Sequence, residues 1–208
     1  MQLRSHTITL CGEHVVLRPM TEDDWETLLA WNNDPEVLYF AEGDDVQSRS
    51  LAEVQAIYRH VSQNAFCFIV ELGGRPIGEC WLQQMNLERI LQQHPGQDCR
   101  RIDLLIGEQD YWGLGLGSEV IRLLTNFAFT QAQADIVFGC DIADYNPASR
   151  RAFEKAGYRV TGVHEQPPGQ KARRCYDVSI TREQYQQRIE NQTDVGLRIK
   201  RTWRRYRD

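Results

Sequence analysis

A cluster of glycines in the middle of the chain has the composition of a phosphate-binding loop. Residues 111–119 read YWGLGLGSE, between a strand-like run at 101–106 and a helical pattern that continues to Phe129. Glycines permit unusual backbone angles, and the free N–H groups at a helix start, together with the positive end of the helix dipole, attract a pyrophosphate. The order of strand, glycine turn and helix therefore predicts a phosphate cradle without selecting a cofactor.

Two nucleotide cofactors and a purely structural turn are alternatives for this segment. The nucleoside triphosphate interpretation fails because no Gly-Lys-Ser or Gly-Lys-Thr follows the glycines. A dinucleotide would need G-x-G-x-x-G in an early βαβ unit and an acidic residue about 20 positions later. Asp135 lies near that spacing, but the glycines run G-x-G-x-G and lie in mid-chain. An isolated G-x-G more often only tightens a strand-to-helix connection. The choice between a cofactor-binding loop and a structural turn therefore depends on the signature segment that follows.

That segment, 146–158, reads NPASRRAFEKAGY. Together with the glycine loop it resembles the two signature segments of the GNAT superfamily of N-acetyltransferases, and the resemblance covers roughly residues 10–180. It implies an α/β (α+β) GNAT fold, in which helices flank a central mixed, mostly antiparallel sheet of six to seven strands. A fold of this kind agrees with the alternation of strand and helix patterns along the chain.

The resemblance implies acetyl-coenzyme A as the cofactor. The loop would hold its pyrophosphate, and the start of the second segment would contact the pantetheine arm. Trp112 stands where the family normally has Gln or Arg, a pattern similar to the branch with ribosomal-protein and aminoglycoside 6'-N-acetyltransferases. Arg101-Ile102-Asp103 resembles the aminoglycoside enzymes most. The implied cofactor contacts are Leu105, Trp112, Gly113, Leu114, Gly115, Leu116, Gly117, Ser118, Asn146, Ala148 and Arg151.

Acetyl transfer to an amine requires a group that takes a proton. An alkyl ammonium with a pKa near about 10 is almost entirely protonated at neutral pH, and a carboxylate near the thioester can act as base. In the enzymes that the chain resembles, an aspartate at the place of Asp103 has this role, so Asp103 is the predicted base. The alternative is a structural salt bridge with Arg100 or Arg101. Phe153 stands where some relatives have a tyrosine acid, which leaves Tyr145, Tyr158 or water.

Acidic and aromatic residues are the expected contacts of a cationic acceptor. Each also has an ordinary structural alternative: a solvent-exposed strand position, a loop cap or core packing. The mechanism that we expect is direct attack of the amine on the thioester, with strand N–H groups stabilising the oxyanion. The predicted acceptor contacts are Tyr39, Glu42, Asp44, Glu79, Trp81, Asp103, Asp141 and Asp144.

Local patterns predict the elements that position these residues. A helix is expected over 22–31 and another over 51–61, where Ser50 and Glu53 form a capping box. The strongest hairpin signal joins 66–72 to 76–82 through Gly73-Gly74-Arg75. The pattern also predicts two short strands within 7–18, strands at 136–140 and near Val160 and Val178, and a helix over 148–156.

Charge divides the 208 residues into two parts. The formal net charge is −5, yet residues 182–208 hold 8 Lys or Arg against 4 Asp or Glu. We therefore expect an acidic acetyltransferase domain at 1–181 and a helical, basic extension at 182–208. The acidic body disfavours nucleic acid and attracts cations. The tail is expected to pack on its own domain or on the second subunit of a homodimer, the alternative being contact with RNA.

Further expectations concern the location and the metal content. No apolar run reaches the roughly 20 residues of a membrane span, and the N-terminus lacks a signal-peptide pattern, which predicts a cytoplasmic protein with no membrane partner. The six cysteines form no C-x-x-C pair, so no metal site is expected.

The predicted function is acetyl transfer from acetyl-coenzyme A to a primary amine of a small polycation, with the 6'-amine of an aminoglycoside antibiotic as the leading acceptor and antibiotic resistance as its role. A protein N-terminus of the ribosomal-protein type or a polyamine is the alternative acceptor. A non-catalytic acyl-coenzyme A sensor is the alternative outside enzymes.

Overall fold

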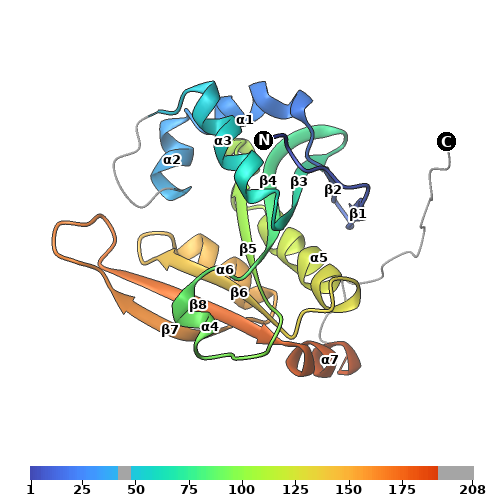
Figure 1. The fold of residues 1–208 in the computed structure, drawn as a ribbon, viewed down its shortest axis with the longest axis vertical. Helices are drawn as coiled ribbons and strands as arrows, with labels where there is room; N and C mark the ends of the chain where they lie inside the picture. Colours follow the sequence, from blue (N-terminus) through green and yellow to red (C-terminus); the bar gives the residue numbers. More distant parts are fainter. Residues whose placement is uncertain (42–47, 192–208) are drawn as a thin grey trace.

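The structure is a computed structural model that describes residues 1–41 and 48–191. It is a mixed α/β domain built on one sheet with the strand order β1-β2-β3-β4-β5-β6-β8-β7 (Figure 1). All neighbouring strands pair antiparallel except β5 and β6. The strands are β1 (Leu10–Cys11), β2 (Val15–Pro19), β3 (Ala65–Leu72), β4 (Arg75–Gln84), β5 (Cys99–Ile106), β6 (Ile136–Ala143), β7 (Arg159–Glu165) and β8 (Arg174–Thr181).

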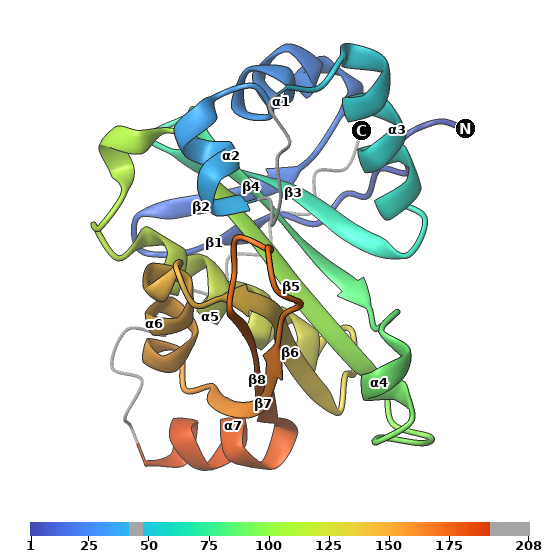
Figure 2. The same cartoon turned by 90° about the vertical axis from the view of Figure 1, so that its left-hand side faces the viewer.

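Helices cover both faces of this sheet. The group α1, α2 and α3 lies on one side and α5 and α6 on the other, while β5 runs between the N-terminal and C-terminal halves (Figure 2). The α-helices are α1 (Trp25–Trp31), α2 (Pro35–Ala41), α3 (Leu51–Val61), α4 (Glu88–Leu91), α5 (Leu116–Thr130), α6 (Pro147–Lys155) and α7 (Arg182–Glu190), with short 3-10 turns η1 (Glu22–Asp24) and η2 (Gln109–Tyr111).

Most predicted elements are confirmed, and the differences are local. The sheet of the described residues has eight strands where six to seven were expected, and the two short strands predicted within 7–18 are β1 and β2 at its edge. The helix expected over 22–31 begins as a 3-10 turn. Helix α4 was not predicted, since it is a single short turn inside a polar segment.

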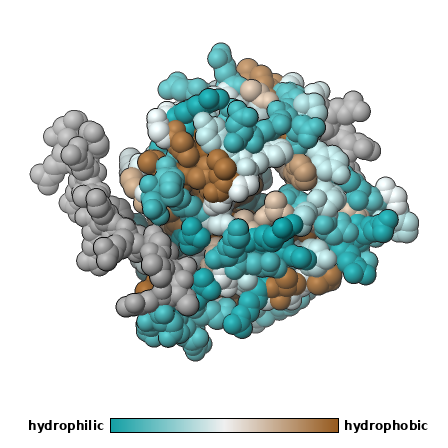
Figure 3. All heavy atoms as spheres, turned by 180° about the vertical axis from the view of Figure 1, so that it is seen from behind, coloured by the Kyte–Doolittle hydropathy of each residue, from teal (hydrophilic) through white to brown (hydrophobic). Residues whose placement is uncertain are grey.

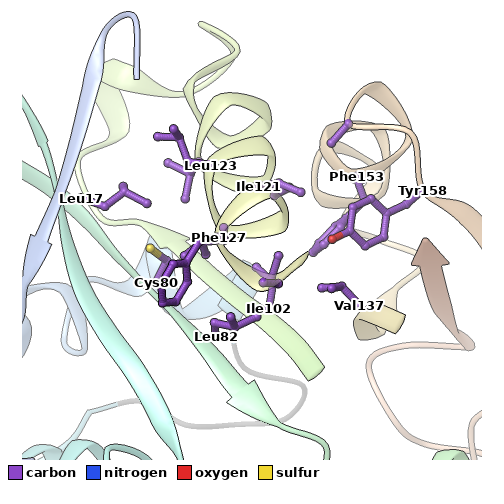
Figure 4. Packing of buried hydrophobic residues seen from close by; sticks show 14 of the residues in the cluster. Leu17, Cys80, Leu82, Ile102, Ile121, Leu123, Phe127, Val137, Phe153 and Tyr158 are labelled. Carbon is purple, nitrogen blue, oxygen red and sulfur yellow. The ribbon is translucent and has the colours of Figure 1, made fainter. Parts of the chain in front are cut away.

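The two faces of the sheet have separate apolar cores. On one face α5 packs on alternate residues of the central strands, among them Cys80, Leu82 and Ile102 (Figure 4). On the other face α1 and α3 pack on Cys67 and Ile69. Side chains two apart on a strand share a face, so Glu79 and Trp81 face α1 and α3, away from α5.

The parallel pair β5–β6 is short, and this opens the sheet. Only Cys99 to Arg101 of β5 pair with Ile136 to Phe138 of β6, although each strand has eight residues. Beyond these pairs β5 remains bonded to β4 through Ile106, and β6 remains bonded to β8. The strands therefore separate toward the glycine loop, leaving the β6-facing edge of residues 103–106 without a strand partner.

Two observations concern the molecule's periphery. No helix among the described residues is long and apolar enough to cross a membrane. On the face shown in Figure 3, hydrophilic residues break the apolar surface into separate patches.

Helix α7 packs on the body, where Arg182 Nη1 donates to the Phe129 carbonyl at 2.7 Å and Tyr185 is buried. The rest of the predicted basic extension, 192–208, lies outside the described residues.

Candidate active site

The glycine loop has the backbone of an anion cradle. Gly113 and Gly115 have φ values of 75° and 86°, in the left-handed region that favours glycine. A Cβ at either position would meet no atom within 4 Å, so both face open space. Gly115 caps the 15-residue helix α5, whose first N–H groups lack acceptors within the helix. The loop is thus shaped to present amides and a helix dipole to a pyrophosphate.

Beside the glycine loop, hydrogen bonds and a ring contact connect the loop with α2 and α6. The Trp112 indole Nε1 donates to the Ile106 carbonyl at 2.7 Å, and its ring contacts Phe40 edge to face at 5.6 Å. Asn146 caps α6 by accepting from the Ser149 N–H, while its Nδ2 donates to the Phe40 carbonyl at 3.3 Å. Trp112 therefore fixes the loop to the end of β5, and Asn146 links the second signature segment to α2.

The other predicted cofactor residues line the same region. Leu114 is 65% exposed beside the cradle, and Leu116 and Ser118 are buried at the start of α5. Gly117 packs near Leu104. Ala148 and Arg151 are exposed on α6. Leu105 lies on the part of β5 that has separated from β6 and is paired with Glu79 of β4, so the backbone groups that face the free edge there belong to its neighbour Leu104.

Side chains of the chain itself already donate hydrogen bonds to Asp103. Arg101 donates to both of its oxygens, from Nη2 at 2.7 Å and from Nε at 2.9 Å. The Trp81 indole Nε1 also donates to Asp103, at 2.9 Å. Of the two partners considered from sequence, Arg101 is the one found, whereas Arg100 pairs with Asp98 at 2.6 Å. Three donors thus hold the carboxylate, so an incoming ammonium has to compete with Arg101.

Glu79 lies next to Asp103 but in a different environment. It is 4% exposed, and its Oε2 has no hydrogen-bond partner in the described part of the chain. The Tyr58 hydroxyl donates to its Oε1 at 3.4 Å, and Asn32 Nδ2 in turn donates to that hydroxyl at 3.1 Å. Burial raises the pKa of Glu79 well above its usual value, and the charge of Asp103 adds to this effect.

Asp141 belongs to an ionic cluster that the sequence did not reveal. It sits at an irregularity of β6 with a φ of 54°, and its carboxylate pairs with Arg89 of α4 at 2.7 Å. Arg89 also pairs with the buried Asp177 at 3.0 Å, which receives the Asp141 N–H at 3.0 Å. His164 Nε2 lies 2.6 Å from the same carboxylate. Asp141 therefore faces an arginine of the chain itself.

Asp144 and Tyr39 lie where the β7–β8 connection meets α2. Asp144 accepts from the Arg173 N–H at 3.3 Å, and its own N–H donates to the Arg174 carbonyl, as in a loop cap. Tyr39 is 50% exposed, and the Lys171 ammonium lies 3.6 Å from its ring centre and 4.4 Å from that of Tyr145. Glu42 and Asp44, the other predicted acceptor contacts, lie outside the described residues.

The structure brings Glu79, Trp81 and Asp103 together on one sheet face, at the start of the separation between β5 and β6. Sequence reasoning missed Arg89, which pairs with Asp141, and Lys171, which lies over the ring of Tyr39. Arg89 comes from a polar segment without a recognisable motif, and Lys171 from a loop, so neither carried a signal. The pairing of Arg101 with Asp103 did carry a sequence signal, because residues two apart on a strand point to the same face.

Comparison with known proteins agrees with this geometry. Residues 14–159 match the family described as the acetyltransferase (GNAT) domain. The chain is 26% identical over 167 residues to the aminoglycoside N(6')-acetyltransferase type 1 of Klebsiella pneumoniae and, equally, to that of Serratia marcescens, covering 78% of this chain and 82% of each relative.

Solved structures give the same result. The fold resembles the structure of AAC(6')-Ib in complex with ribostamycin and coenzyme A, with a TM-score of 0.72 and 25% identity over 84% of this chain and 97% of the other. Spermidine N-acetyltransferase from Vibrio cholerae, in complex with coenzyme A and spermine, shares the fold with a TM-score of 0.68 at 18% identity, covering 84% of this chain and 99% of the other. The chain belongs to the GNAT acetyltransferases and is an acetyl-coenzyme A-dependent N-acetyltransferase.

Proposed function

We propose that this enzyme acetylates a primary amine of a small polycationic acceptor, with the 6'-amine of an aminoglycoside as the leading candidate and antibiotic resistance as its role. The observation that carries the proposal is the pair of carboxyl groups, Glu79 and Asp103, beside the point where β5 and β6 separate. Carboxyl groups on a partly buried face attract ammonium groups. The likeness to aminoglycoside 6'-N-acetyltransferases supports the same acceptor class.

The cofactor fits between the separated strands. Acetyl-coenzyme A would place its pyrophosphate on the amides around Leu114 to Ser118, where Gly113 and Gly115 leave open space. Its pantetheine arm would pair with the free edge of β5 near Leu105, as a strand partner does. When bound, the cofactor supplies the activated acetyl group.

The chain's own residues would then prepare the acceptor. The acceptor ammonium would replace Arg101 at Asp103, which the sequence predicts as the base. The resulting neutral amine attacks the thioester carbonyl, and N–H groups of the β5 edge stabilise the oxyanion. Of the two tyrosines that the sequence offers as acids, Tyr145 and Tyr158, the latter is buried and hydrogen-bonded to Thr125 at 2.7 Å. A thiolate with a pKa of about 8.5 leaves without one.

Thiol release from acetyl-coenzyme A tests this proposal. The acceptors are kanamycin, ribostamycin, spermidine and an N-terminal ribosomal peptide, with wild type compared to Asp103→Asn. We expect turnover on the aminoglycosides, reduced at least about 100-fold in the variant, as for loss of a general base. Glu26→Gln, an exposed substitution on α1, is the control. Turnover only on the peptide or only on spermidine would show that the acceptor belongs to that class and is not an aminoglycoside. Tight binding of acetyl-coenzyme A without any turnover would indicate a sensor.

A further inference from the structure

We propose that Glu79 is the proton-holding residue of the acceptor site: it releases a proton to solvent when an acceptor ammonium binds beside Asp103, and its carboxylate then takes one proton from that ammonium. The inference rests on the proposed function, because it requires a cationic amine as acceptor. It moves the base role, which the sequence predicts for Asp103, to Glu79, while Asp103 keeps the role of binding the ammonium.

Strand register brings the two carboxyl groups together. Glu79 of β4 is opposite Leu105 of β5, and Trp81 is opposite Asp103. Glu79 and Asp103 are therefore diagonal neighbours on one face, at a separation that long side chains bridge. An ammonium placed between them would contact both carboxyl groups.

The hydrogen bonds distinguish the two carboxyl groups. Asp103 carries three donor contacts, two of them from Arg101, and is held as an anion. Glu79 has a single contact with Tyr58, and its buried Oε2 is unpaired in the part of the chain that the structure describes. A buried carboxylate with an unpaired oxygen costs several kcal/mol, so the resting form of Glu79 is the neutral acid.

The other groups around Glu79 do not compete for its proton. Tyr58 from α3, Cys67 from β3 and Cys80 on its own strand are buried, and burial raises the pKa of each, to about 12 for Cys67. None of these groups ionises near neutral pH. Among the described residues, Asp103, which is paired with Arg101, is the charged group that acts on Glu79. Arg18, two strands away opposite Ile69, is paired with Asp24 and Glu71, and α1 contributes apolar side chains. A cation arriving at Asp103 therefore favours ionisation of Glu79 first.

Protons and electrons balance through the cycle. The acceptor enters as an ammonium, and Glu79 loses its proton to solvent. The Glu79 carboxylate stays ion-paired with the ammonium until acetyl-coenzyme A is in place, and it takes one of the ammonium protons as the N–C bond begins to form. The amine lone pair forms the N–C bond, the C–S bond breaks, and the thiolate leaves with its electron pair. The second amine proton passes to the thiolate, which leaves Glu79 protonated again.

Infrared difference spectroscopy tests the resting state without an acceptor. The carbonyl stretch of a protonated carboxyl should be present in the wild type at about pH 7 and absent from Glu79→Gln, since an ordinary glutamate is ionised there. Glu26→Gln should leave the band unchanged. A wild-type spectrum without this band overturns the proposal, whichever amine the enzyme acetylates.

The same band tests the coupling to the acceptor. Kanamycin added to the coenzyme A complex should remove the band from the wild type, and its persistence once calorimetry shows kanamycin bound would overturn the inference. Glu79→Gln should lower kcat at least about 100-fold and flatten the acidic limb of the pH profile of kcat, with an unchanged KM for acetyl-coenzyme A. Glu79→Asp should restore part of kcat and part of the acidic limb of its pH profile. If the wild type acetylates neither kanamycin nor spermidine, the proposed function fails, while the free-enzyme spectrum still decides the state of Glu79.

Discussion

At the residue scale, the acidic side chains that the sequence predicts as acceptor contacts differ in what neutralises them. Asp103 is paired with Arg101, and Asp141 with Arg89. Glu79 lacks a cationic partner among the described residues and stays neutral by protonation. Under the proposed function, an acceptor with several ammonium groups would therefore have to displace internal arginines, and those arginines would weaken its binding.

Substitution of Arg101 tests this competition. Arg101→Met removes the cation that occupies Asp103 and keeps a long apolar side chain. The KM for kanamycin should fall by about tenfold, the scale of a charge-assisted hydrogen bond. Steady-state kinetics would measure it, with Arg59→Met, which removes an exposed ion pair with Glu22, as the matched control. A higher KM in Arg101→Met alone would show that Arg101 orients Asp103 and does not compete with the acceptor.

At the element scale, the start of α5 is built around a backbone conformation that only glycine adopts easily. Gly115→Ala should lower the free energy of unfolding by about 1 kcal/mol because its φ of 86° is strained for alanine. It should also raise the Kd for acetyl-coenzyme A about tenfold, since the cradle amides shift. Gly96→Ala, at a φ of 76° in a distant loop, should show the stability loss alone. Equal Kd values for both variants would contradict a phosphate site at this helix start.

The β6 irregularity depends on Asp177 of β8, which links α4, β6 and β7. Burial acts to raise the pKa of Asp177, but hydrogen bonds from Arg89, the Asp141 N–H and His164 lower it overall. A lowered folded-state pKa stabilises the protein above the unfolded value of about 4, and this contribution is lost as the pH falls through the folded-state pKa.

Asp177→Asn should therefore destabilise the protein by about 1 to 3 kcal/mol at neutral pH and by less at about pH 3. Urea unfolding at the two pH values would measure both effects. The same loss at both pH values would show that hydrogen bonding, and not ionisation, is what Asp177 contributes.

At the scale of the whole molecule, the formal net charge of −5 favours cationic acceptors. Salt screens such attraction over about 10 Å at 0.1 M. The KM for kanamycin should rise severalfold between about 0.02 and 0.3 M NaCl, while kcat at saturation stays constant. Initial rates across this range would measure both parameters. A KM that does not change with salt would show that contacts inside the site, and not the net charge of the protein, determine acceptor binding.

Local patterns in the sequence were sufficient for most of the elements and for the cofactor region. The glycine loop, the hairpin around Gly73-Gly74 and the helix that begins beside Asn146 depend on neighbouring residues, and each was found where predicted. The sequence also singled out Glu79 and Asp103, which the sheet brings together. Fold class and cofactor were thus determined by short-range rules and by two recognisable segments.

Only the tertiary structure determined which charged side chains contact one another. Arg89 contacts Asp141 and Asp177, which lie 52 and 88 residues away in the sequence, through a short helix and an irregularity of β6 that no local pattern indicated. The neutral state of Glu79 follows from α3 and β5 closing over it, and the separation of β5 from β6 follows from where their pairing ends. Burial and strand register are collective properties of the folded chain, so the chemistry of the acceptor site could not be predicted from residue types alone.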